Sequence, residues 1–79
     1  MINGKCLMFT LDLLGVVNPI CLLKSKDALS KMRQGDILEI WVQDPEVVES
    51  LSKILEHSGD RLEGTFEEKD RYRILVRKG

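Results

Sequence analysis

Hydrophobic and polar residues alternate along several short segments of this chain, a pattern typical of strands with one buried face. In one such segment Leu38, Ile40 and Val42 share a side, while Glu39 and Trp41 lie on the other. The pattern predicts four strands, which are Leu7–Leu13, Ile37–Gln43, Arg61–Glu67 and Arg71–Arg77.

The two segments between the first three strands carry helical spacing, and each opens on a capping residue followed by proline. The pair Asn18-Pro19 predicts a helix with Asn18 as N-cap and Pro19 at the first helical position, and Gly35 is expected to end it. The pair Asp44-Pro45 predicts a second helix that ends at Ser58-Gly59. The first helix is expected to bury Cys21, Leu22, Ser25, Ala28, Leu29 and Met32.

Side-chain parity predicts how the last two strands pair. If Phe66 shares the core face with Tyr72, Glu67 lies opposite Arg71 and residues 68–70 form the turn. A two-residue turn would instead place Phe66 opposite Arg73, on conflicting faces. We therefore expect the three-residue turn.

The element order is thus β-α-β-α-β-β. Strands joined by a helix should be parallel with right-handed crossovers, which places both helices on one face of the sheet. The expected fold is a two-layer α/β sandwich, formed by residues 1–79 as one domain, whose second sheet face is open.

Composition narrows the function classes. Two cysteines and one histidine among 79 residues cannot form a four-ligand zinc site of Cys and His or a disulfide scaffold. A net charge of −1 argues against a dedicated nucleic-acid binder, and no segment resembles a signal peptide or a membrane span. We expect a cytosolic protein with no metal and no cofactor.

Charge and aromatic placement point to a protein partner. Residues 1–34 carry five basic and two acidic residues, whereas residues 35–60 carry one basic and seven acidic residues. Lys24 and Lys31 on the first helix, with Trp41 on the open sheet face, are therefore candidates for an interaction surface. The alternatives are a solvated helix face and a tryptophan that only shields the sheet. The arginines of Arg71-Tyr72-Arg73 fit cross-strand ion pairs better than an RNA contact.

Cys21 is the candidate for chemistry. It lies near the start of the first helix, where the dipole stabilises a thiolate modestly. It also lies on the apolar side of that helix, where a cysteine packs as a small hydrophobe. Both interpretations stay open from the sequence. Cys6 is more consistent with packing or fraying than with reactivity.

The stretch from Leu11 to Cys21 resembles the opening signature of the TusA/SirA-like sulfur carriers, which reads Asp-x-x-Gly-x-x-Cys-Pro-x-Pro. Asp12, Gly15 and Pro19 match it, and the similarity extends over about residues 9 to 78. The resemblance implies a mixed sheet of order 1-2-4-3, as in the C-terminal domain of bacterial translation initiation factor three. It also implies a persulfide received from a cysteine desulfurase and passed to a protein acceptor.

The sequence departs from this signature where its cysteine should be. That cysteine falls on position 18, which is Asn18, and the second proline falls on Cys21. An amide cannot hold a persulfide, so Cys21 is the only plausible carrier if the activity persists. The alternative is a thiol-independent interaction or regulatory module on the same fold.

Overall fold

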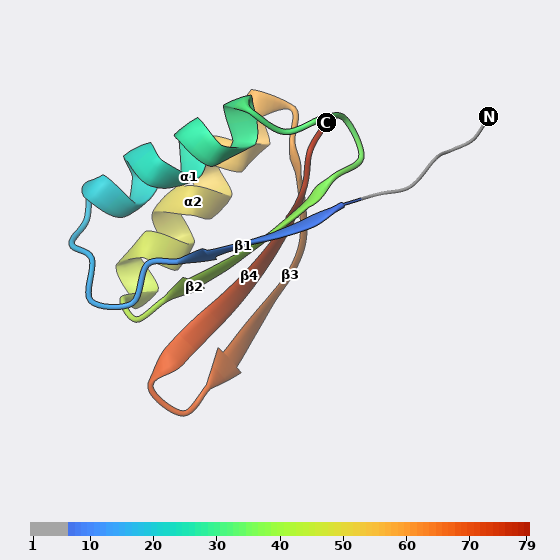
Figure 1. Ribbon diagram of the computed structural model, residues 1–79. Helices are drawn as coiled ribbons and strands as arrows, with labels where there is room; N and C mark the ends of the chain where they lie inside the picture. Colours follow the sequence, from blue (N-terminus) through green and yellow to red (C-terminus); the bar gives the residue numbers. More distant parts are fainter. Residues whose placement is uncertain (1–6) are drawn as a thin grey trace.

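The computed structural model describes residues 7–79, in which a four-stranded sheet forms one layer and two helices cover one of its faces (Figure 1). The sheet order is β1-β2-β4-β3, with β1 parallel to β2 and β4 antiparallel to both of its neighbours. The element order and the two-layer architecture expected from the sequence are confirmed. The elements are β1 (Met8–Asp12), α1 (Ile20–Ser30), β2 (Ile37–Val42), α2 (Pro45–Ser58), β3 (Arg61–Glu68) and β4 (Arg71–Arg77).

The two central strands carry the core. Leu38, Ile40 and Val42 of β2 lie opposite Val76, Ile74 and Tyr72 of β4, and all but the partly buried Tyr72 are almost fully buried beneath the helices. Each helix adds residues spaced by three or four positions, as the sequence pattern predicted. The helical contribution consists of Cys21, Ser25 and Leu29 from α1 and Val47, Leu51 and Leu55 from α2.

The start of α1 differs from the prediction. The helix begins at Ile20 with Pro19 in the N-cap position, and the Asn18 side chain makes no capping hydrogen bond. The Cys21 N–H donates to the carbonyl of Val17 at 3.1 Å. This backbone carbonyl satisfies a donor of the first turn, which makes a side-chain cap from Asn18 unnecessary there. The Asn18-Pro19 peptide bond is cis.

The end of α1 also differs from the prediction. The helix ends at Ser30, five residues before Gly35, because Lys31 and Met32 donate to the carbonyls three residues back and tighten the last turn. Gly35 has a φ of 94° and shapes the turn into β2. The carboxylate of Asp36 then accepts from the N–H groups of Arg33 and Leu7, which ties this turn to the start of β1.

The cap-and-proline prediction is correct for α2. Asp44 caps the helix by accepting from the Glu46 N–H at 2.9 Å, and Pro45 occupies the first helical position. Gly59 adopts a left-handed φ of 85° at the other end. The start of α2 is therefore fixed beside the loop that enters α1.

The pairing predicted for β3 and β4 is wrong. Glu68 lies opposite Arg71, so the turn contains only Lys69 and Asp70, and Phe66 lies opposite Arg73. The register shifts between Leu62 and Gly64, which inserts Glu63 as an extra residue. A bulge of this kind reverses the side-chain alternation beyond it, so the parity argument fails from residue 64 onward.

Phe66 consequently lies on the open face of the sheet instead of in the core. Its ring packs over Gly64, where an added Cβ would come within 3.0 Å of two ring carbons. The guanidinium of Arg73 lies 5.6 Å from the ring centroid on the same face. The side chain keeps 46% of its surface exposed, so it contributes little to the core.

This placement makes Phe66 tolerant of truncation. We expect Phe66→Ala to lower the free energy of unfolding by about 1.5 kcal/mol or less, the scale of exposed aromatic and cation–π contacts. Ile40→Ala, in the buried core, should cost about 2–5 kcal/mol. Urea unfolding of the two variants tests this, and a loss at Phe66 as large as that at Ile40 would restore the core assignment.

Candidate functional site

The segment that joins β1 to α1 lies beside the start of α2, and the two border an open depression of about 490 Å³. This is the place where the sequence signature falls. The depression is lined by Gly15, Val16, Val17, Asn18, Cys21, Val42, Gln43, Asp44, Glu46 and Val47.

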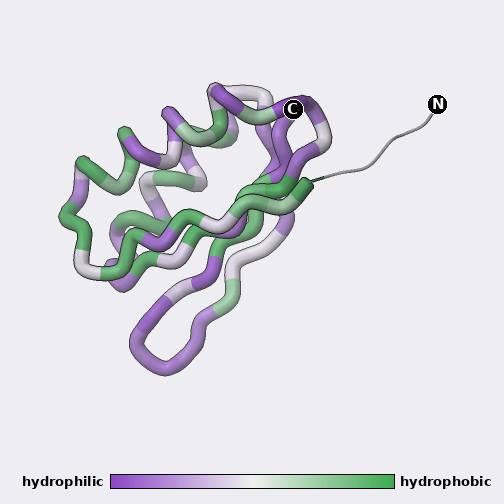
Figure 2. The backbone as a smooth tube through the Cα atoms, viewed as in Figure 1, coloured by the Kyte–Doolittle hydropathy of each residue, from purple (hydrophilic) through white to green (hydrophobic). Residues whose placement is uncertain are grey.

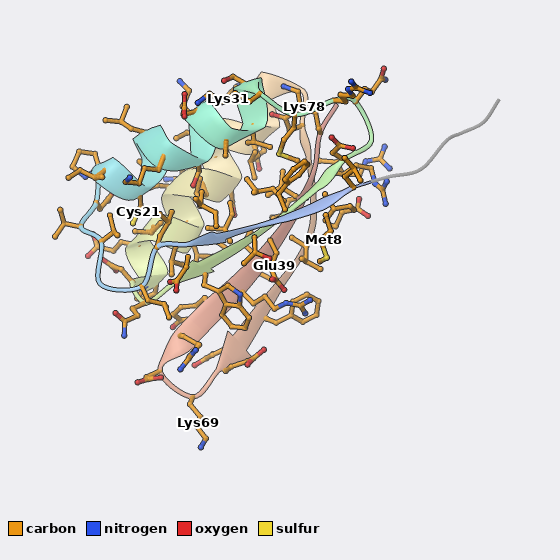
Figure 3. The ribbon with its side chains drawn as sticks, in the orientation of Figure 1. Met8, Cys21, Lys31, Glu39, Lys69 and Lys78 are labelled. Carbon is orange, nitrogen blue, oxygen red and sulfur yellow. The ribbon has the colours of Figure 1, made fainter. Side chains whose placement is uncertain are left out.

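Cys21 belongs to the floor of this region and not to its surface. Only 1% of its surface is exposed, and it lies near the start of α1 on the side of the helix that faces the core (Figure 3). The thiol donates to the Val16 carbonyl at 3.1 Å, and the Ser25 hydroxyl donates to the Cys21 carbonyl at 2.8 Å. The thiol thus fastens the entering loop to the helix.

Electrostatics oppose ionisation of this thiol. Burial raises the pKa of Cys21 above its ordinary value of 9.0, the carboxylate of Asp44 raises it further, and a backbone hydrogen bond at residue 21 acts in the opposite direction. Because the thiolate is the nucleophile in sulfur chemistry, a neutral buried thiol is a poor sulfur acceptor.

Asn18 and Pro19 occupy the exposed part of the same loop. Asn18 lines the depression, so the position of the signature cysteine is at the surface while Cys21 is beneath it. The accessible position of the loop therefore carries no thiol, and the thiol of Cys21 is not accessible.

The end of α1 next to this loop presents an apolar surface that the sequence analysis did not identify. Val17, Ile20 and Leu23 are exposed, Leu23 to 65%, and Figure 2 shows hydrophobic residues at this end of the helix. Two doublets contained the signal, Val16-Val17 and Leu22-Leu23, because only one member of each can face the core. We call Val17, Ile20 and Leu23 the apolar end of α1.

The predicted interaction residues do not form one surface. Lys24 is exposed on α1, next to Leu23, and Lys31 makes an ion pair with Asp27 at 3.1 Å farther along the helix. Trp41 lies on the opposite side of the sheet, half-buried, with the Arg71 guanidinium 5.8 Å from its ring centroid. Trp41 is thus on the open face as predicted, but it is remote from the helices.

That open face holds a polar network. The Nε of Arg73 donates to Glu39, which also accepts from the Thr10 hydroxyl at 3.0 Å. These bonds, chiefly the one from Arg73, lower the pKa of Glu39 below its ordinary value of 4.5. Arg73 is therefore engaged by Glu39 and Phe66, which fits the cross-strand role expected for it.

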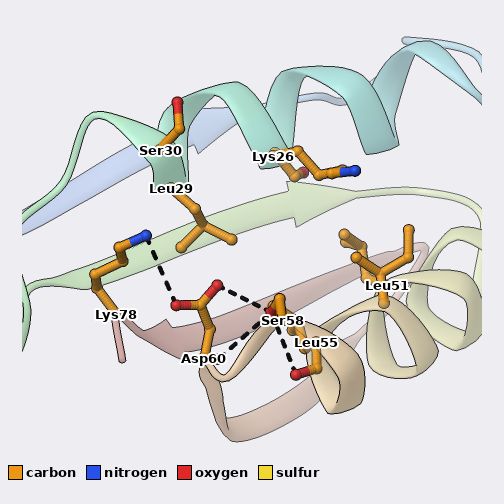
Figure 4. Close-up of a pocket in the computed structure, with 10 residues that line it drawn as sticks. Lys26, Leu29, Ser30, Leu51, Leu55, Ser58, Asp60 and Lys78 are labelled. Atoms are coloured by element: carbon orange, nitrogen blue, oxygen red, sulfur yellow. Dashed lines mark hydrogen bonds and ion pairs between the residues drawn. The ribbon is translucent and has the colours of Figure 1, made fainter.

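A second concavity, of about 180 Å³, lies between the helices toward the C-terminal end of α1 (Figure 4). Leu29, Leu51 and Leu55 give it an apolar floor, and Lys78 makes an ion pair with Asp60 at 3.9 Å on its rim. The described residues that line this concavity include no cysteine and no histidine. Within residues 7–79 there is no group of three potential metal ligands and no helix long and apolar enough to cross a bilayer.

Comparisons with known proteins agree with the fold and with the family that the sequence resembles. The family model described as Sulfurtransferase TusA matches residues 9–78. A "Putative sulfur carrier protein" of Methanocaldococcus jannaschii is 30% identical over 71 residues, which cover 90% of this chain and 95% of that protein. The sulfur carrier protein TusA of Allochromatium vinosum is 28% identical over 68 residues, covering 86% and 90% of the two chains.

A solved structure confirms the architecture. The crystal structure of a SirA-like protein from Desulfitobacterium hafniense superposes with a TM-score of 0.82 at 24% identity, covering 91% of this chain and 99% of that one. At this identity the likeness supports the fold alone.

The burial of Cys21 predicts slow alkylation and a distinct alkaline response. In a Cys6→Ser background, where Cys21 is the single thiol, a thiol reagent should label the protein only as fast as it unfolds. Because the folded pKa of Cys21 is raised, this group stabilises the fold below 9.0 and loses that contribution as the pH rises further.

Adding Cys21→Ser to that background keeps a hydroxyl donor for Val16 and removes the titrating group, so it serves as the matched control. Its stability should fall less steeply above 9.0 than that of the single-thiol protein. Rapid labelling under native conditions would contradict the buried assignment.

The lowered pKa of Glu39 predicts that the stability of the fold falls on acidification, whereas the raised pKa of Cys21 predicts a fall at alkaline pH. The pKa of Glu39 is lowered in the fold, so the stabilising contribution of this residue is present above 4.5 and is lost as the pH falls through the folded value. Glu39→Gln should lower stability at neutral pH and flatten the loss on acidification. Urea unfolding over a series from neutral to acidic pH measures both effects, and equal acid slopes in the two proteins would refute the role of Glu39.

Proposed function

Because this chain belongs to the TusA family of sulfur carriers, we propose that it acts as a protein-binding member of a sulfur relay whose own thiol does not carry the sulfur. Membership in this family implies protein partners in sulfur relay. The proposal concerns the form that this participation takes here: binding of a sulfur donor, such as a cysteine desulfurase, or of a sulfur acceptor.

One observation carries the proposal. The only described thiol is 1% exposed and donates to Val16, while the exposed signature position holds Asn18. A persulfide on Cys21 would need room for a second sulfur atom inside a packed core, and the thiolate that accepts it is disfavoured by burial. The chain therefore has the fold of the family but no thiol at the exposed position of the signature.

The loop and helix end that surround Asn18 supply the binding surface. The apolar end of α1 is exposed beside the depression, and Lys24 adds a positive charge next to it. Exposed apolar side chains grouped at one end of a helix are typical of protein contacts. In this proposal the partner supplies the sulfur-bearing cysteine, and this protein orients or restrains it.

The alternative is that Cys21 carries the sulfur after the loop opens. One observation favours it: Cys21 lines the depression together with Val16 and Asn18. In this structure the Cys21 thiol donates a hydrogen bond to the Val16 carbonyl, which keeps it beneath the loop. If that bond breaks and the loop moves aside, the thiol reaches the depression.

A gain-of-function variant tests the proposal. In Asn18→Cys, the new thiolate stands at the exposed signature position, where it can attack the outer sulfur of a desulfurase persulfide. The new S–S bond forms as the desulfurase thiolate leaves. We expect mass spectrometry to show one added sulfur on residue 18 after incubation with a cysteine desulfurase and cysteine, and none on the wild type.

The sulfur carrier protein TusA of Allochromatium vinosum, treated in parallel, checks that the desulfurase is active. Sulfur on Cys21 of the folded wild type would overturn the proposal and establish the alternative. Binding of the desulfurase or of a sulfur-acceptor protein, measured by calorimetry, should weaken in Leu23→Asp and not in Glu49→Lys on the exposed face of α2. Equal weakening in the two variants would remove the apolar end of α1 from the interface.

A further inference from the structure

Strand β1 is an edge strand whose outer side is unpaired in the described chain. The Leu7 carbonyl accepts from Ile37 at 2.8 Å, and the Leu13 N–H donates to Trp41 at 2.9 Å, so the odd-numbered residues turn their peptide groups toward β2. In a parallel ladder the intervening residues turn theirs the other way. The N–H and C=O groups of Met8, Thr10 and Asp12 therefore face outward.

Among residues 7–79, the opposite edge of the sheet is protected against strand addition and β1 is not. Strand β3 has a bulge after Leu62 and carries four charged residues among its eight, and both features discourage strand addition. Strand β1 pairs without a register shift and carries one charge, Asp12, whose carboxylate already accepts from the Leu14 N–H at 3.0 Å. The two edges are thus unequal, and β1 is the one open to a further strand.

The side chains along this edge are apolar. Leu7, Met8 and Phe9 are exposed, Met8 to 54%, although they adjoin the sheet. On the helix side the edge borders a groove of about 200 Å³ between β1 and α1. Its lining is mostly apolar and consists of Phe9, Thr10, Leu11, Ala28, Lys31, Met32 and Leu38.

We propose that β1 pairs antiparallel with β1 of a second copy of this chain, which joins the two sheets into one of eight strands. In the register centred on Phe9, Phe9 faces Phe9 of the second copy and Leu7 faces its Leu11. These pairs lie on the helix side, above the two grooves. Met8 faces Thr10 of the second copy on the open side, and the outward peptide groups of both residues become hydrogen-bonded.

The side-chain pattern selects this occupant and this register. A strand added here must present apolar residues toward the groove and uncharged residues on the open side, and residues 7–11, which begin one residue before β1, do both. Centring on Thr10 would place Met8 opposite Asp12. Pairing β1 with β3 of another copy would leave the new sheet with open ends and would bring the charges of β3 to the apolar edge.

Sedimentation velocity over micromolar to millimolar protein concentrations tests the pairing. One short strand from each copy makes a small interface, so we expect a weak, concentration-dependent dimer. Phe9→Lys and Met8→Lys place a charge on the paired edge and should each keep the protein monomeric. Thr65→Lys adds the same charge to the β3 edge and should leave the dimer intact.

A disulfide tests the register. Opposed residues of a non-hydrogen-bonded pair have Cα atoms about 4.5 Å apart, within disulfide range. In a Cys6→Ser background, Phe9→Cys should therefore cross-link two copies rapidly under mild oxidation. Thr10→Cys should cross-link slowly, because its equivalent lies two residues along the partner strand and beyond about 7 Å.

A wild type that stays monomeric at the highest concentration, with its circular dichroism spectrum intact, overturns the proposal. So does a dimer that Thr65→Lys disrupts and Met8→Lys does not. Faster cross-linking at residue 10 than at residue 9 overturns the register. Because Met8 is exposed on the open face, Met8→Lys decides the question even if Phe9→Lys fails to fold.

Discussion

The antiparallel pairing of β2 with β4 is the constraint on which the rest of the structure depends. In this pairing the apolar residues of β2 lie opposite the apolar residues of β4. One face of the sheet is therefore continuously apolar, and the other face carries the polar side chains of both strands. Both helices pack on the apolar face, and the two outer strands extend it on either side. The free energy of a domain this small comes mainly from that one buried layer.

This layer also determines the fate of Cys21. Cys21, the second residue of α1, faces the sheet once the helix lies across it, so a cysteine there is used for packing. Its thiol connects the helix to Val16, and burial keeps it protonated. The loop position that faces solvent is occupied by Asn18, which supplies hydrogen-bonding groups and no nucleophile. The fold of a sulfur carrier is thus combined with a buried thiol and with exposed apolar side chains beside the loop.

The bulge in β3 has consequences for both sides of the sheet. It moves Phe66 to the open face, where the aromatic rings of Trp41 and Phe66 each lie beneath an arginine. It also protects one edge of the sheet while β1 stays open at the other. The open face is therefore occupied largely by aromatic–guanidinium contacts and by the Glu39 network. Most of the exposed large apolar side chains gather along β1 and at the start of α1.

The sequence by itself determined the order of elements, the buried faces of β2 and of α1, and the cap of α2. Each of these follows from local periodicity or from a residue that satisfies the hydrogen bonds of its neighbours. Only the tertiary structure decided the start of α1, where the Val17 carbonyl replaced an Asn18 cap, and the face taken by Phe66. Gly64 inside a strand pattern was the available signal for a bulge, but its effect on register depends on pairing with β4. The sequence likewise left open whether Cys21 is reactive or packed in the core. The position of a residue on a helix specifies the direction of its side chain, and only the packing of the sheet against α1 shows what that side chain contacts.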